Sequence, residues 1–308
     1  MSESFTTKRA SGSARTSSSG KRRKVLVTGA AGNIGSYFAE HSHGRYDLRL
    51  MERTIDDDAK AVAKFGELVQ GDITDLDRMK EVCRGIDTVV HLAADPSPSA
   101  TWDSLISANI VGTYNTFVAA KAAKCRRVIY ASSIHAVSGY PEDYQVHTSD
   151  PVNPGDLYGV SKCFGEALAR YMAEKEGVSA ICLRIGAFQP HESARDPVKG
   201  IAMLDAWVSR RDLNQLIEKC IDTEDLQFAV FHGLSDNRFK RLDITDARQL
   251  VGYAPQDDLT EVNPKLAGLD LDDKVNVHSL ADESQKSGIR EELRGGKQKS
   301  GGRTRHGR

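Results

Sequence analysis

The sequence predicts a doubly wound α/β fold, in which helices cover both faces of a parallel sheet. Two observations carry this prediction. Short runs rich in β-branched residues alternate with helical patterns over residues 24–184, as expected for repeated strand–helix–strand units. A glycine-rich turn also follows the first of these runs, where a fold of this class turns from a strand into a helix and binds its ligand.

The elements follow one another in regular order. The expected strands end at Thr28, Met51, Val69, His91, Tyr130 and Arg184. The expected helices cover residues 34–41, 58–65, 76–83, 102–123 and 157–175. Because crossovers between parallel strands are right-handed, this order gives a doubly wound sheet. The chain shows no internal repeat and no long linker, so we expect the ligand crevice at the carboxyl ends of the strands.

Composition divides the 308 residues into an acidic body and two basic ends, although the net charge is only −1. The ends are rich in Ser, Gly, Lys and Arg and hold too few apolar residues to offset the entropy lost on ordering. We therefore predict disordered basic tails over 1–22 and 269–308, and a folded region over 23–268 with a small substrate lobe built mainly from 186–268. An acidic body argues against nucleic acid as its ligand, and the tails are the exception.

The chain lacks the features of a membrane or secreted protein. It has no apolar stretch near the roughly 20 residues of a membrane span and no apolar segment of a secretory signal. Five cysteines are scattered without paired spacing or partner histidines, so we expect no metal site and no disulfide framework. These features predict a cytoplasmic protein without a membrane partner, and they leave the oligomeric state open, a homo-oligomer included.

The glycine-rich turn has the sequence TGAAGNIG over residues 28–35 and connects a strand to a helix. Its glycines allow a sharp turn, a close approach of the backbone to phosphate oxygens, and close packing of the next helix. The pyrophosphate of a dinucleotide then meets free N–H groups at the helix N-terminus. The turn therefore predicts NAD(P) binding. The expected contacts are Gly29, Gly32, Asn33, Ile34 and Gly35.

An acidic residue, Glu52, closes the second expected strand, about twenty residues after the glycine turn, where such folds bind the adenosine ribose. Its carboxylate accepts hydrogen bonds from the ribose hydroxyls and repels a 2′-phosphate, which favours NAD over NADP. The neighbouring Arg53 works in the opposite direction, since a guanidinium pairs with a 2′-phosphate. We predict NAD as the cofactor.

Two further strand ends supply expected cofactor contacts. Asp72, in the sequence GDIT, is placed to accept a hydrogen bond from the adenine amino group, with Ile73 beside it. The sequence HLAA after the fourth strand supplies Leu92, Ala93 and Ala94, whose small size lets the backbone approach the ribose and nicotinamide. Loop ends of this kind are common, so these assignments depend on the glycine turn.

The residues that carry chemistry are Tyr158 and Lys162, four apart and therefore on one face of a helix. A phenol with a pKa near 10 is a poor base at neutral pH, but a neighbouring ammonium and a positive nicotinamide ring stabilise its phenolate. Ser133, at the end of the preceding strand, is placed to hold the substrate oxygen for proton and hydride transfer. We predict these three as catalytic residues, with Lys162 also bonding the nicotinamide ribose.

In this order, TGAAGNIG, Glu52, GDI, HLAA, Asn109, ASS and YGVSK resemble the extended short-chain dehydrogenase/reductase family, also called NAD-dependent epimerases/dehydratases. The resemblance covers roughly residues 24–265 and implies a Rossmann fold with Ser133, Tyr158 and Lys162 as its catalytic triad. It also implies that Asn109 organises the helix and a water near Lys162, at the cofactor. The sequence RLDITD at 241–246 is similar to the closing motif of that family.

Within the family, residues 157–166 and 184–186 look most like uronate dehydrogenases, whereas 91–96, 102–104 and 233–237 resemble NAD-dependent sugar-phosphate 1-dehydrogenases. The resemblance to both groups implies oxidation of the anomeric carbon of a pyranose to a lactone. Three departures leave the sugar open. Ile134 replaces the asparagine of those enzymes, Ala187 replaces a serine of the uronate dehydrogenases, and the arginine used on a uronate carboxylate falls near Ala202. The expected substrate contacts are Ser133, Ile134, His135, Ala187 and Arg211.

Three functions stay open. The first is NAD-dependent oxidation of a uronate, an aldose or a hexose phosphate to a lactone. The second is a nucleotide-sugar epimerase/dehydratase or carbonyl reductase of the same family, and the third is a non-catalytic NAD(H)-binding regulatory protein. The chain after Lys162 is short for a lobe that wraps a nucleotide sugar, which favours a small sugar, and the complete Ser–Tyr–Lys set argues against the third function.

Overall fold

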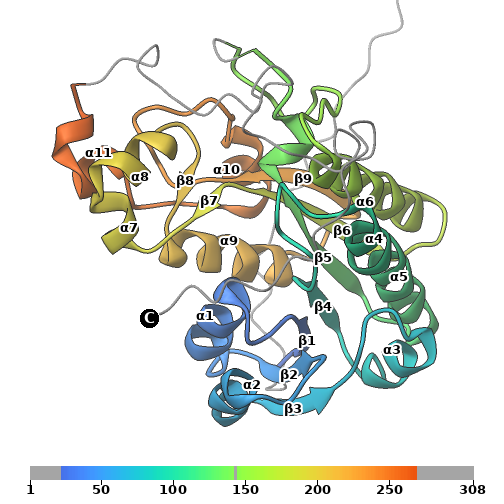
Figure 1. Ribbon diagram of the computed structural model, residues 1–308. Helices are drawn as coiled ribbons and strands as arrows, with labels where there is room; N and C mark the ends of the chain where they lie inside the picture. Colours follow the sequence, from blue (N-terminus) through green and yellow to red (C-terminus); the bar gives the residue numbers. More distant parts are fainter. Residues whose placement is uncertain (1–21, 142–143, 269–308) are drawn as a thin grey trace, which may run out of the picture.

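The computed structural model describes residues 22–141 and 144–268. They form a parallel sheet with helices on both faces and a smaller lobe beside its carboxyl edge (Figure 1). Apart from Arg22, the predicted basic tails lie outside the described residues, so their disorder stays a prediction.

The main sheet has seven strands in the order β3-β2-β1-β4-β5-β6-β9, and every neighbouring pair is parallel. The strands are β1 (Lys24–Thr28), β2 (Asp47–Glu52), β3 (Glu67–Gln70), β4 (Thr88–His91), β5 (Arg127–Ser133), β6 (Ser179–Ile185) and β9 (Phe228–Gly233). The strand order runs outward in both directions from β1, which creates a switch point between β1 and β4 where such sheets bind their ligands. The predicted doubly wound fold is confirmed, and β9 is a further strand that was not predicted.

Helices follow the strands as expected, with one difference. The principal helices are α1 (Asn33–Ser42), α2 (Asp57–Val62), α3 (Leu76–Val82), α5 (Gly112–Ala122), α6 (Leu157–Glu174) and α9 (Arg210–Asp222). The stretch 102–123, expected as one helix, is divided into α4 (Trp102–Ser104), the π-helix η2 (Leu105–Val111) and α5. Such π-helical segments are frequent at functional sites.

Side chains cap most of the helices that frame the sheet. Asp56, Asp75 and Asp156 each accept a backbone N–H from the first turn of α2, α3 and α6, and Ser209 does the same for α9. Helix α1 differs, because it begins after Gly32 without a side-chain cap. Its first-turn N–H groups therefore stay available to an anion.

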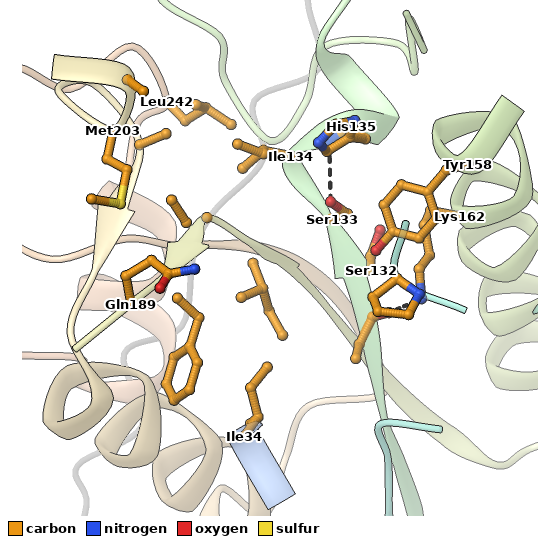
Figure 2. Close-up of a pocket in the computed structure, with 18 of the residues that line it drawn as sticks. Ile34, Ser132, Ser133, Ile134, His135, Tyr158, Lys162, Gln189, Met203 and Leu242 are labelled. Carbon is orange, nitrogen blue, oxygen red and sulfur yellow. Dashed lines mark hydrogen bonds between the residues drawn. The ribbon is translucent and has the colours of Figure 1, made fainter. Parts of the chain in front are cut away.

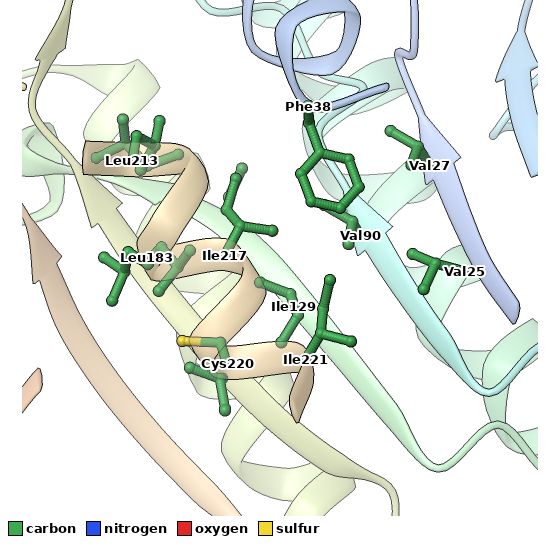
Figure 3. Packing of buried hydrophobic residues seen from close by; sticks show 14 of the residues in the cluster. Val25, Val27, Phe38, Val90, Ile129, Leu183, Leu213, Ile217, Cys220 and Ile221 are labelled. Carbon is green, nitrogen blue, oxygen red and sulfur yellow. The ribbon is translucent and has the colours of Figure 1, made fainter. Parts of the chain in front are cut away.

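Two hydrophobic cores lie on the two faces of the sheet. On one face, α1 and α9 pack on the strands through side chains that include Phe38, Ile217 and Ile221, against Val27 and Ile129 (Figure 3). On the other face, α3, α5 and α6 contribute a second cluster. The burial of apolar area on both faces holds the parallel strands in place. The loops that follow these strands therefore meet at one edge of the sheet.

The smaller lobe is built around the buried Trp207, which packs with Ala194, Met203 and Leu204. Its elements are β7 (Ala187–Phe188), α7 (His191–Arg195), α8 (Pro197–Ala202), β8 (Trp207–Val208), α11 (Leu259–Val262) and η4 (Pro264–Leu266). Within the predicted lobe range 186–268, α9, β9 and α10 (Thr245–Val251) instead extend the layers of the main sheet. The lobe therefore occupies part of that range.

Candidate active site

A cavity of about 720 Å³ lies where the carboxyl ends of β4, β5 and β6 face the smaller lobe (Figure 2). Its size suits a small molecule together with part of a cofactor. Nine residues predicted for the site line it: Ile34, Leu92, Ala94, Ser133, Ile134, His135, Tyr158, Lys162 and Ala187. The other predicted site residues do not line the cavity, and their surroundings are described below.

The glycine turn is built as a dinucleotide cradle. Gly29 has φ of +70°, and a Cβ there would lie 3.0 Å from the backbone nitrogen of Ala93. A Cβ at Gly35 would lie 2.3 Å from the carbonyl oxygen of Gly29, so neither position accepts a side chain. This close packing and the uncapped start of α1 fit the pyrophosphate of a dinucleotide.

Glu52 lies directly beneath this turn, because its Oε1 accepts a hydrogen bond of 2.6 Å from the backbone N–H of Ala31. Burial raises the pKa of Glu52, and the Ala31 hydrogen bond opposes that rise. Arg53 is exposed next to it. Both residues therefore stand at the predicted ribose position, at the end of β2.

The other predicted adenosine and ribose contacts have structural roles of their own. One oxygen of Asp72 accepts hydrogen bonds from the N–H and the hydroxyl of Thr74, both at 2.8 Å. Ile73 is buried against Gly112 of α5. Ala93 donates its N–H to the Thr28 hydroxyl at 3.2 Å, which fastens the loop after β4 to β1.

Tyr158 and Lys162 project from α6 toward the end of β5 (Figure 2). Burial raises the pKa of Tyr158 to about 12, although a hydrogen bond with Ser133 opposes the rise. Burial lowers the pKa of Lys162 to about 8, and its Nζ donates to the carbonyl of Ala131 at 2.8 Å. In this structure the pKa of Tyr158 is thus raised rather than lowered, and burial is the largest cause.

A buried chain of hydrogen bonds starts next to Ser133. The Ser132 hydroxyl donates to Glu166 at 2.6 Å, and Arg184 donates to both oxygens of that carboxylate at 2.9 Å. His232 follows, with its Nε2 3.5 Å from Arg184 and its Nδ1 2.7 Å from the carbonyl of Asp243. A carbonyl only accepts, so Nδ1 carries the proton, and burial lowers the His232 pKa to about 4.

Asn109 lies in the π-helix η2 and is buried beside the cavity without lining it. Its side-chain oxygen accepts from the N–H of Asp95 at 2.8 Å, and its amide donates to the Ser161 hydroxyl at 2.9 Å. Ser161 in turn donates to the carbonyl of Tyr158. In this structure Asn109 thus connects the loop after β4 to the first turn of α6, which positions Tyr158.

The predicted substrate contacts divide into two groups. His135 lines the cavity with its ring 5.3 Å from that of Tyr158, and its Nδ1 lies 2.7 Å from Asp156 Oδ2. Ile134 and Ala187 also line the cavity. Arg211 does not, because in the first turn of α9 it bonds Asp257 at 2.6 Å and is about half exposed.

The lobe contributes a wall that the sequence did not assign to the site. Ala202, near which the resemblance places an arginine, lies on this wall. Its polar members are Gln189, Ser193, Lys199, Asp205 and Arg241. Arg241 opens the motif RLDITD, whose resemblance to the closing motif of the family indicates only where the fold ends.

Two negative findings concern the described residues alone. Among residues 22–141 and 144–268, no cluster of three or more His, Cys, Asp or Glu side chains is arranged to hold a metal ion. In the same part of the chain, no helix combines the length and the apolar character needed to cross a membrane.

The fold and site define a nucleotide-dependent oxidoreductase, with a dinucleotide cradle at β1 and a Ser–Tyr–Lys set at β5 and α6. The model of the NAD dependent epimerase/dehydratase family matches residues 25–200. The chain belongs to this family, as its sequence motifs predicted.

Named relatives cover most of the chain. It is 36% identical to the NAD-dependent glucose-6-phosphate dehydrogenase of Haloferax volcanii, over 77% of this chain and 94% of that protein. It is 34% identical to the L-arabinose 1-dehydrogenase (NAD(P)(+)) of the same organism, over 78% and 98%. Among solved structures, uronate dehydrogenase from Agrobacterium tumefaciens matches with a TM-score of 0.71 and 31% identity, over 81% and 90% of the two chains.

Proposed function

We propose that this protein is an NAD-dependent dehydrogenase that oxidises the anomeric carbon of a monosaccharide to a lactone. The observation that carries the proposal is that Ser133, Tyr158 and Lys162 line one cavity beside the dinucleotide cradle. The relatives named above, two sugar dehydrogenases and a uronate dehydrogenase, support it.

The chain's own residues account for the proton in this reaction. NAD, when bound, supplies the nicotinamide ring that accepts the hydride from C1 of the sugar. Ser133 holds the C1 hydroxyl, and Tyr158 accepts its proton, so that the C1–H and O–H bonds are exchanged for a carbonyl. Because burial raises the Tyr158 pKa to about 12, the positive charges of Lys162 and of the oxidised cofactor have to offset burial for Tyr158 to act as a base.

The size and walls of the cavity favour a small sugar over a nucleotide sugar. About 720 Å³ has to hold both the reacting end of the cofactor and the substrate. Beyond Ser133 and Tyr158, the cavity is lined by side chains such as Gln189, Met203 and Leu242 (Figure 2). A nucleotide attached to the sugar would have to extend past this wall.

The test is an NAD-reduction assay on the purified full chain with glucose, arabinose, glucuronate, galacturonate and glucose 6-phosphate. We expect one NADH for each sugar consumed, and a lactone that hydroxylamine traps. Tyr158→Phe is the matched control, and it should bind NAD while reducing it about two to four orders of magnitude more slowly. Interconversion of a UDP-sugar without net NADH would favour an epimerase, and NAD binding without turnover on any substrate would favour a regulatory protein.

We also propose a location, an oligomeric state and a role for the basic tails. A cytoplasmic location and a homo-oligomer are compatible with a sugar dehydrogenase of this kind. The basic tails lie outside the described residues, and any binding of a polyanion would involve them rather than the acidic body.

A further inference from the structure

The lobe wall of the cavity carries positive charge. Arg241 and Lys199 both line the cavity, and Asp205 is the one carboxylate among its lining residues in the described chain. Figure 2 shows Met203 and Leu242, which are close in sequence to Asp205 and Arg241, on the side of the cavity away from Tyr158. A positively charged wall therefore faces the catalytic residues across the space for substrate.

Arg241 is nine-tenths buried, with 10% of its side chain exposed, yet its hydrogen bonds are incomplete. Its Nε is buried and has no hydrogen-bond acceptor among the described residues. That atom lies 3.6 Å from Asp205 Oδ2, beyond the 2.7–2.9 Å of a charge-assisted hydrogen bond. Its Nη1 reaches the Tyr140 carbonyl only at 3.5 Å.

Two other buried arginines show how this chain satisfies a guanidinium that serves the fold. Arg184 bonds both oxygens of Glu166 at 2.9 Å and also contacts His232. All three nitrogens of Arg127 bond Ser179 or backbone carbonyls. Leaving a buried N–H unpaired carries a free-energy penalty. Arg241 departs from this pattern, and it does so where the side chain lines a cavity.

The position of this wall relative to Tyr158 suggests the ligand. A pyranose that presents its C1 hydroxyl to Ser133 and Tyr158 directs the opposite end of its ring toward the lobe. A carboxylate or phosphate carried there would meet the guanidinium of Arg241 and the ammonium of Lys199. Planar guanidinium groups match both anions, and partial burial strengthens the attraction.

We propose that Arg241, assisted by Lys199, binds an anionic substituent of the sugar and so selects a hexuronate or a hexose phosphate over a neutral aldose. This inference rests on the proposed function. Asp205 is a positioning residue, because its carboxylate lies beside the Nε edge of Arg241 and limits the directions in which the guanidinium turns. The positive charges of Arg241 and Lys199 outnumber that of Asp205, so the wall attracts an anion.

The kinetic test compares glucuronate, glucose 6-phosphate and glucose in the wild type, Arg241→Gln, Arg241→Lys and Lys199→Gln. We expect the wild type to prefer one or both anionic sugars, and their separate values identify which anion fits. Arg241→Gln should lower kcat/KM for the preferred anion roughly 10- to 100-fold, mainly through KM, as for a lost hydrogen bond to a charged group. Lys199→Gln should have a smaller effect in the same direction, and Arg241→Lys should lie between wild type and Arg241→Gln.

Three controls make the result specific. Turnover of glucose should change little in each variant, and the Kd for NADH should stay at the wild-type value. Arg248→Gln, which alters an exposed arginine of α10 that pairs with Asp236 outside the cavity, should leave all three substrates unchanged. Inorganic phosphate should compete with the anionic sugar in the wild type and lose that effect in Arg241→Gln.

Several outcomes would overturn the inference. They are an unchanged KM for anionic sugars in Arg241→Gln, an equal loss for glucose, or weaker NADH binding that explains the loss. If no sugar is oxidised by the wild type, the proposed function fails, and calorimetric titration of the NAD complex with glucuronate and glucose 6-phosphate still tests the anion site. If Arg241→Gln does not fold, Arg241→Lys and the exposed Lys199→Gln decide, and wild-type values in both would refute the role.

Discussion

The buried pair of Glu166 and Arg184 gives a prediction whose size follows from the structure. Only 7% of the Glu166 side chain and 3% of the Arg184 side chain are exposed, and the two share two hydrogen bonds of 2.9 Å. Removing one partner of such a pair leaves an uncompensated buried charge, which costs about 3–5 kcal/mol. Glu166→Leu should therefore lower the free energy of unfolding by about that amount.

For a folded region of this size, each kcal/mol shifts the melting temperature by roughly 2–4 °C, so a decrease of about 6–20 °C is expected. The double variant Glu166→Leu/Arg184→Met removes both charges and replaces them with apolar side chains of similar size. It should recover most of the lost stability, because a buried ion pair and a packed apolar pair are often nearly equal in free energy. Thermal and urea unfolding of the wild type, Glu166→Leu, Arg184→Met and the double variant completes a double-mutant cycle.

The Glu166–Arg184 pair should also affect catalysis, because it helps to position Ser133. Glu166 follows Lys162 by one turn of α6 and accepts the hydroxyl of Ser132, next to Ser133. Glu166→Gln retains the shape of the side chain but weakens its contact with Ser132, so it should disturb the placement of β5 against α6. The fold-decrease in kcat should therefore be larger than the fold-increase in KM. A decrease in unfolding free energy below about 1 kcal/mol for Glu166→Leu, or equal losses in the single and double variants, would refute the reasoning.

Three further predictions concern the catalytic and cofactor residues. Tyr158→Phe should lower kcat by about two to four orders of magnitude, with NADH affinity by fluorescence titration within a few-fold of wild type, since only the proton acceptor is lost. Glu52→Ser should raise kcat/KM for NADP relative to NAD, because the carboxylate no longer repels the 2′-phosphate and Arg53 remains to pair with it; a wild-type preference for NADP would contradict this. Burial lowers the Lys162 pKa to about 8, so between pH 8 and the ordinary value of 10.5 the unfolded state binds more protons, and this group makes stability rise with pH. Urea unfolding of Lys162→Met should accordingly show its largest gain over wild type near pH 7, and a gain that does not shrink toward pH 10.5 would contradict the pKa shift.

The parts of the fold that the sequence predicts are those whose signal is local. Strand β1 ends at Thr28 and β4 at His91, as the apolar runs indicated, and the glycine turn lies between β1 and α1. Tyr158 and Lys162 share a helix face because of a four-residue spacing, which no tertiary contact alters. Strand β9 carries an equally local run, FAVFHG, with the apolar and aromatic residues typical of a buried strand.

Other features depend on contacts between distant segments. The π-helix interrupts the expected helix 102–123 where Asn109 bonds Asp95 and Ser161, and no periodicity records those partners. Arg211 was expected at the substrate, but its place in the first turn of α9 directs it to Asp257. The Tyr158 pKa also depends on burial, which a spacing of residues does not reveal.

Substrate specificity is the property least visible in the sequence, because it arises where the lobe meets the sheet. Strand β6 passes into the lobe at Gly186, where a Cβ would lie 2.1 Å from the carbonyl oxygen of Ala206. That contact holds the segment carrying Asp205 against the end of β6, while Arg241 arrives from a loop after β9. The proposed catalytic residues lie on β5 and α6, whereas the charged wall lies across the cavity from them. Substitutions at Arg241 should therefore change which sugar is oxidised while the proton transfer at Tyr158 is retained.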